Sequence, residues 1–136
     1  MNLQNGFQLD EPAVLVPWSI TEAELQELLA NSKLHKVTGG YYTLDCRPLG
    51  GLAHTIGFHF RDDVIGLFEF FQKGENVKSF SEFQTHLEMT FGAPTQCRAG
   101  TEGFNDYRWL IDGFEIIHTV QERFGPEERL SISPIR

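Results

Sequence analysis

The sequence predicts an α+β fold in which two helices pack on an antiparallel sheet of about six strands. Two stretches, residues 21–71 and 79–133, each run from a helical segment through a Gly-containing connection to three strand-like segments. Connections between these strands are too short for parallel crossovers, which favours antiparallel pairing. The two stretches align as Glu24-Leu25 and Leu28-Leu29 with Glu82-Phe83 and His86-Leu87, and Ile56-Gly57-Phe58 with Ile116-Ile117-His118. We therefore predict a duplicated α-β-β-β unit.

The length of 136 residues predicts a single domain spanning residues 1–136. Within it, the pseudo-repeats cover about residues 19–72 and 79–134, and residues 1–18 form an N-terminal arm. Apolar residues 13–16 end at Pro17, and proline is tolerated at sheet edges rather than in central strands. The arm is therefore expected to be extended or to form an edge strand.

Both helices carry start signals. Thr21 with Glu24, and Ser79 with Glu82, have the spacing of capping boxes. The second helix places phenylalanine and leucine at helical spacing on one face, and Gly92 is expected just after its last turn.

The strands are predicted from apolar and aromatic alternation at about residues 41–46, 54–61, 64–72 and 129–133, and on both sides of Asp112-Gly113. Asp-Gly favours a two-residue type I′ turn, which places Ile111 opposite Phe114 and Tyr107 opposite His118. If Phe68 and Phe70 point toward the helices, the other sheet face carries Leu67, Glu69, Phe71, Leu110 and Ile117. Such a half-apolar face is usually covered, and the candidates are the N-terminal arm, a second copy of the chain, or a partner.

Composition narrows the classes of function. The net charge is −8 and no basic stripe is present, so nucleic-acid binding has little electrostatic support. The acidity favours solubility or attraction to a basic partner. With 12 phenylalanines, the chain has a surplus of aromatic area for an interface. No apolar run approaches the length of a membrane span, and the N-terminus lacks the features of a signal peptide, so we expect a cytoplasmic protein.

Catalytic and metal-binding patterns are absent from the sequence. The five histidines have no metal-ligand spacing, Cys46 and Cys97 lack an evident base, and phosphate-binding glycine loops do not occur. We therefore predict no catalytic residue, cofactor or metal. His118 is interpreted as a core or rim histidine beside Tyr107, and Glu69 as either edge protection or the partner of a basic group. A ligand pocket would first implicate Tyr107, Trp109 and His118.

The order of helix, three strands, helix and further strands over residues 20–120 resembles that of the class I type III secretion chaperones. The chain differs from them in lacking a clear C-terminal helix and in adding a final strand. By size and acidity it also resembles the small immunity proteins that neutralise bacterial toxins. Both resemblances imply a bacterial binding protein, which is commonly dimeric among the chaperones.

We therefore predict a non-catalytic, cytoplasmic protein-binding module that acts by surface complementarity, with a protein partner or a homodimer and with neither nucleic acid nor membrane involved. The alternative is a small-ligand-binding or enzymatic domain that uses the open sheet face.

Overall fold

The computed structural model describes residues 2–74, 77–100, 103–122 and 125–135. These residues form a short 3₁₀ helix at Leu3–Asn5, the two α-helices α1 (Glu22–Leu28) and α2 (Phe80–Phe91), and ten strands. The strands are β1 (Phe7–Gln8), β2 (Leu15–Val16), β3 (His35–Thr38), β4 (Tyr41–Leu49), β5 (Leu52–Arg61), β6 (Val64–Gln72), β7 (Gln96–Ala99), β8 (Asn105–Ile111), β9 (Phe114–Glu122) and β10 (Pro126–Pro134).

The predicted fold class is wrong, because the described chain is mostly β. Eight strands form one antiparallel sheet in the order β3-β4-β5-β6-β10-β9-β8-β7, and β1 pairs with β2 in a separate small sheet. The predicted sheet of about six strands, three from each unit, is therefore two strands smaller than the eight-stranded sheet in the structure. In the structure each helix is followed by four strands, and the two sets of four meet through β6 and β10 at the centre of the sheet.

The two strands of the large sheet that the sequence did not predict are β3 and β7, which form its two edges. Each has four residues, and all eight of these residues are exposed. An exposed edge strand has no apolar alternation for a sequence pattern to reveal. Short edges with charged side chains, here Lys36 and Arg98, also discourage pairing with other chains.

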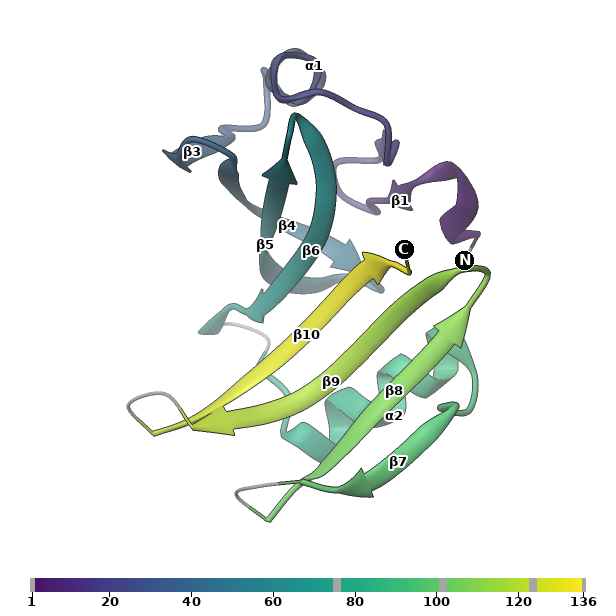
Figure 1. Cartoon of the computed structure of the whole chain (residues 1–136). Coiled ribbons are helices and arrows are strands. Elements are labelled where there is room, and N and C mark those ends of the chain that lie inside the picture. The colour runs from purple at the N-terminus through teal and green to yellow at the C-terminus, as the bar shows by residue number, and fades with distance from the viewer. Residues whose placement is uncertain (1, 75–76, 101–102, 123–124, 136) are drawn as a thin grey trace.

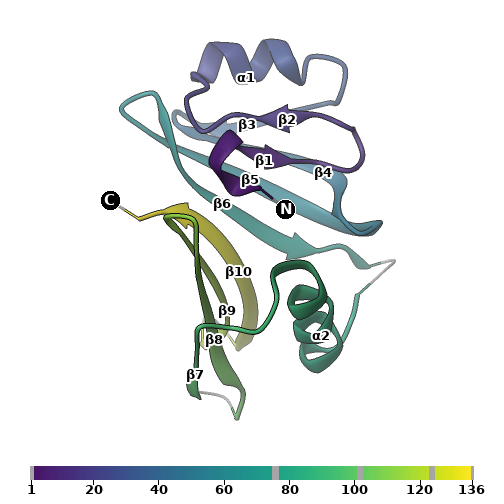
Figure 2. The same cartoon turned by 90° about the vertical axis from the view of Figure 1, so that its right-hand side faces the viewer.

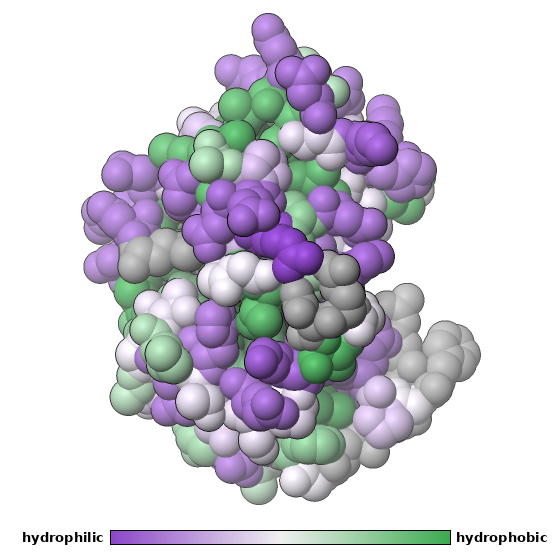
Figure 3. Space-filling model, turned by 180° about the vertical axis from the view of Figure 1, so that it is seen from behind, coloured by the Kyte–Doolittle hydropathy of each residue, from purple (hydrophilic) through white to green (hydrophobic). Residues whose placement is uncertain are grey.

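The helices and the N-terminal arm lie on one side of the sheet. Figure 1 looks onto β8 and β9 with α2 behind them, and Figure 2 shows α1 and the β1–β2 pair over β3–β6, with α2 beside β8–β10. From the side of α2, hydrophilic and hydrophobic surface alternate in small areas (Figure 3). We call the side that carries the helices and the arm the covered face, and the opposite side the open face.

The predicted helix starts are confirmed. Thr21 and Ser79 cap α1 and α2, and each makes both hydrogen bonds of a capping box with Glu24 or Glu82. Gly92 follows α2 with φ of 84°, and its carbonyl accepts a hydrogen bond from Trp109 Nε1 at 2.9 Å. The end of α2 is thereby attached to the middle of β8.

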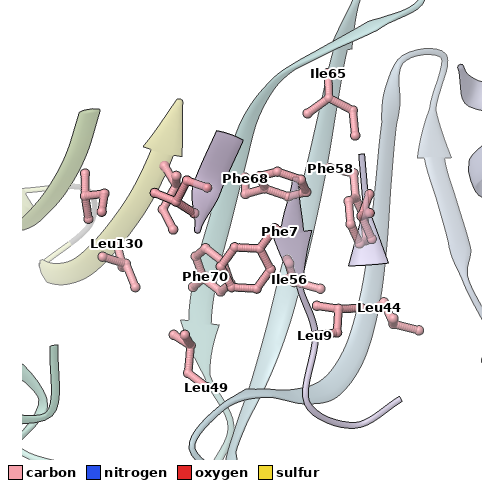
Figure 4. Close-up of a cluster of buried hydrophobic side chains, with 14 of the residues drawn as sticks. Phe7, Leu9, Leu44, Leu49, Ile56, Phe58, Ile65, Phe68, Phe70 and Leu130 are labelled. Atoms are coloured by element: carbon pink, nitrogen blue, oxygen red, sulfur yellow. The ribbon is translucent and has the colours of Figure 1, made fainter. Parts of the chain in front are cut away.

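The core on the covered face depends on the N-terminal arm. Phe7 of β1 is fully buried, and its ring lies 5.5 Å from that of Phe68 and 5.2 Å from that of Phe70 (Figure 4). Trp18 also packs on Phe68, at 4.8 Å between ring centroids. The arm is therefore part of the core on the covered face. It does not cover the open face, which was one of the predicted alternatives.

The β8–β9 hairpin follows the prediction from Asp112-Gly113. Both residues have positive φ, 52° and 84°, as a type I′ turn requires. Ile111 pairs with Phe114, and Tyr107 with His118, in the predicted register.

Replacing Gly113 with valine is expected to destabilise the protein by about 2 kcal/mol, because a β-branched residue is strongly disfavoured at positive φ. Urea unfolding measures the change. Gly66→Val is the matched control, since a Cβ at Gly66 meets nothing within 4 Å and its φ is not positive. Equal stability of the two variants would contradict the turn assignment.

Candidate functional site

The open face is where strand alternation leaves side chains without a covering element among the described residues. In β6, Phe68 and Phe70 are buried under the arm, whereas Leu67, Glu69 and Phe71 point the other way and are partly exposed. This confirms the predicted division of β6 between the two faces. Since β6 pairs with β5 and β10, it is a central strand, so the alternative of Glu69 as edge protection is wrong.

Glu69 is the centre of a charged cluster on the open face, which we call the Glu69 cluster: Tyr41, His59, Glu69 and Arg129. One carboxylate oxygen lies 2.5 Å from His59 Nε2, and the other lies 3.1 Å from Arg129 Nε. The Tyr41 ring stacks on His59 with centroids 4.3 Å apart. Glu69 is thus the partner of basic groups, the second of the two predicted roles.

Gly57 makes room for this stacking. A Cβ on Gly57 would lie 3.0 Å from the Tyr41 ring, which crosses the sheet surface above it. An aromatic ring that lies over a strand glycine in this way shields the bare backbone from water. Tyr41 and His59 are therefore held flat against the open face.

Contacts within the Glu69 cluster change the pKa values of Glu69 and Tyr41. The contact from His59, assisted by the charge of Arg129, holds the pKa of Glu69 below its ordinary value, against the opposing effect of burial. Burial, with the negative charge of Glu69 added, raises the pKa of Tyr41. At neutral pH the cluster therefore contains an ionised carboxylate and a neutral phenol.

The three residues predicted for a ligand pocket lie on the wrong face for that role. Tyr107, Trp109 and His118 point to the covered face, and Trp109 and His118 are fully buried. His118 is the core histidine that the sequence indicated. Its Nδ1 lies 2.8 Å from Gln84 Oε1 of α2, and its Nε2 lies 2.9 Å from Glu128 Oε2 of β10.

This histidine belongs to a structural network. Gln72 of β6 donates to the second oxygen of Glu128 at 2.7 Å and accepts from the Lys78 backbone N–H at 2.8 Å. Phe80 stacks on the imidazole at 4.2 Å. Because these groups connect α2 with β6, β9 and β10 and leave His118 enclosed, the network positions the helix rather than offering a site to a ligand.

The two cysteines lie in different halves of the sheet, in β4 and β7, and both are free. Cys46 packs against the core, and burial, together with the negative charge of Asp45, raises the pKa of its thiol to about 12. Cys97 is exposed on the edge strand. Cys46 is thus protonated at physiological pH, and a thiol in that state is a poor nucleophile.

Within the described ranges, no group of three His, Cys, Asp or Glu side chains is arranged to hold a metal ion. The helices among these residues are also too short and too polar for any of them to cross a membrane.

Sequence reasoning missed Tyr41, His59 and Arg129 as neighbours of Glu69. The connection at Gly50-Gly51 carries no turn signal that fixes register, so Tyr41 could not be placed opposite His59 as the structure places it. The pairing of β10 with β6, which brings Arg129 to Glu69, is a long-range contact without a local signal.

These observations define the class: a mostly β protein with one large antiparallel sheet that is covered on one face and charged on the other. Searches with protein-family models and against curated proteins give no match. Among solved structures, the chain is similar to a DUF4309 family protein (YjgB) from Bacillus subtilis subsp. subtilis str. 168, with a TM-score of 0.52 and 11% identity. The match covers 88% of this chain and 84% of that one, and at this identity it shows a shared fold alone.

Replacing Glu69 with glutamine is expected to destabilise the protein by about 1 kcal/mol at pH 7, because His59 and Arg129 lose their carboxylate. Since the folded-state pKa of Glu69 is lowered, its contribution is complete above the ordinary value of 4.5 and is lost as pH falls below it. The difference between wild type and variant in urea unfolding should therefore shrink as the pH falls below the ordinary value of 4.5. Glu127→Gln is the control, and a difference independent of pH would contradict the ion-pair assignment.

Alkylation distinguishes the two cysteines. We expect iodoacetamide at about pH 8 to modify Cys97 in the folded protein and to spare Cys46, because the Cys46 thiol is half-buried and stays protonated. Mass spectrometry then finds one adduct per chain, none in Cys97→Ser, and two after denaturation of wild type. Equal rates at both thiols in the folded state would contradict the placement of Cys46.

Proposed function

We propose that this chain is a non-catalytic protein-binding module that engages its partner through the open face of the eight-stranded sheet. The observation that carries the proposal is the one-sided arrangement of the described chain. Both helices and the N-terminal arm pack on the covered face, and no described element covers the opposite face.

The composition of the open face supports this role. It combines partly exposed apolar residues, among them Ile117 and Leu110, with the aromatic ring of Tyr41 and the guanidinium groups of Arg108 and Arg129. Aromatic and arginine side chains are enriched at protein interfaces and dominate their binding energy. Ion pairs hold both arginines in place before binding, which reduces the entropy that association costs.

The partner is either another protein or a second copy of the chain, and the module acts in the cytoplasm, as bacterial immunity proteins and secretion chaperones do. Two free cysteines are consistent with a reducing compartment.

A pair of matched charge insertions tests the surface. Leu110→Glu places a carboxylate on the open face at a residue that is 39% exposed, and Met89→Glu does the same on α2, at a residue that is 81% exposed. The immobilised protein is exposed to a lysate of the organism that encodes it, and size-exclusion chromatography with light scattering measures self-association.

We expect Leu110→Glu to lose a stoichiometric protein partner, or the homodimer, which wild type and Met89→Glu both retain. Binding that survives Leu110→Glu but is lost in Met89→Glu would place the interface on the covered side. A strictly monomeric chain that captures no protein at all would reject the proposal in favour of the small-ligand alternative.

A further inference from the structure

The open face of β7, β8 and β9 contains a cavity of about 430 Å³, a volume within the range of ligand-binding sites. Its polar lining comes from all three strands: Gln96 and Arg98 from β7, Asp106 and Arg108 from β8, and Glu115 and Thr119 from β9. It adjoins the Glu69 cluster on the open face, because Thr119 of β9 lies opposite Arg129 of β10 in strand register.

Most charged side chains in this cavity either have a partner within it or point away from it. Arg108 Nε donates to Glu115 at 2.6 Å, and Arg108 Nη1 donates to Gln96 at 3.3 Å. Asp106 pairs with Arg98 in strand register, but its carboxylate lies over Gly100, where a Cβ would come within 2.4 Å of Oδ1. Arg98 is left, among the described residues, without an ion pair or a side-chain hydrogen bond.

A second polar group in the cavity also lacks a partner. Thr119 is only 8% exposed, and within the described part of the chain its Oγ1 makes no hydrogen bond. A buried hydroxyl without a hydrogen bond destabilises a fold, so a bound group that accepts a hydrogen bond from Thr119 would be favoured in this cavity. Arg98 and Thr119 are one unpaired cation and one unused donor on the same cavity.

We propose that this cavity binds a carboxylate on an acidic side chain of the partner protein, with Arg98 forming the ion pair and the Thr119 hydroxyl donating a hydrogen bond. Guanidinium and carboxylate have matching planar geometry, and the pair is stronger when partly shielded from water. A singly charged carboxylate fits better than a phosphate, because Asp106 and Glu115 in the lining would repel a dianion.

The proposal rests on the proposed function, because it names the chemistry that the partner presents to the open face. It can nevertheless be tested without the partner. The probe is N-acetyl-glutamate N-methylamide, which carries the side-chain carboxylate as its one charge, and the matched neutral probe is N-acetyl-glutamine N-methylamide.

Titration of ¹⁵N-labelled protein, followed by the Arg98 Nε–Hε signal and the Thr119 amide, gives the test. We expect a saturable shift with the glutamate probe and none with the glutamine probe. Arg98→Gln should abolish the shift of the Thr119 amide, and Thr119→Val should weaken binding about tenfold, as the loss of one charge-assisted hydrogen bond implies. Arg61→Gln, an exposed arginine at the end of β5, should bind as wild type does.

Urea unfolding measures whether the substitution at Thr119 changes the stability of the fold. Thr119→Val should be at least as stable as wild type, because the hydroxyl it removes has no partner within the described residues. A less stable Thr119→Val would mean that Oγ1 is satisfied within the fold, which overturns its assigned role. The proposal is also overturned by equal shifts from the two probes, or by a saturable shift of the Thr119 amide that persists in Arg98→Gln.

Partner capture separates this inference from the proposed function. If Leu110→Glu loses the partner while Arg98→Gln retains it at wild-type affinity, the open face is the interface and the carboxylate assignment fails. If the probe binds as expected but no protein partner is captured, the cavity is a carboxylate site and the protein-binding role fails.

Discussion

The pairing of β6 with β10 is the constraint on which the rest of the structure depends. It joins the two halves of the sheet through three residue pairs, whereas β9 and β10 share nine. On the covered face this short junction places Leu130 and Ile132 beside Phe70 and Phe68. On the open face the same pairing brings Arg129 to Glu69. A shift of one residue would exchange the two faces, so the core and the Glu69 cluster require the same register.

Polar side chains are enclosed on the covered face and partly exposed on the open face. This difference distinguishes a structural network from a candidate binding site. On the covered face, His118 is enclosed between Gln84 and Glu128 and stacked by Phe80, so its contacts bind α2 to the sheet. On the open face, the partners of Glu69 are about one-third exposed. Buried histidines attract attention as catalytic candidates, but a fully enclosed ring has no room for a substrate. Groups that are ordered yet reachable are better suited to recognition.

The sequence predicted the features that depend on local signals and missed those that depend on distant contacts. The capping boxes, the Asp112-Gly113 hairpin and the division of β6 between two faces were predicted correctly because each depends on residues within a few positions. The fold class was wrong because edge strands β3 and β7 have no buried face to impose a pattern. The pocket residues were placed on the wrong face because alternation shows which residues share a face without showing which face the helices cover.

The two halves of the sheet differ at one corresponding position, which has partners in the first half and none among the described residues in the second. β5 and β9 are each third from an edge of the sheet, and the alignment that matches Ile56 with Ile116 also matches His59 with Thr119. In the first half this position is filled internally, since His59 stacks with Tyr41 and contacts Glu69. In the second half, Thr119 is buried without a hydrogen bond among the described residues, and a cavity lies above it. The chain's own side chains thus satisfy this position in the first half, whereas in the second half it has no hydrogen-bond partner among the described residues.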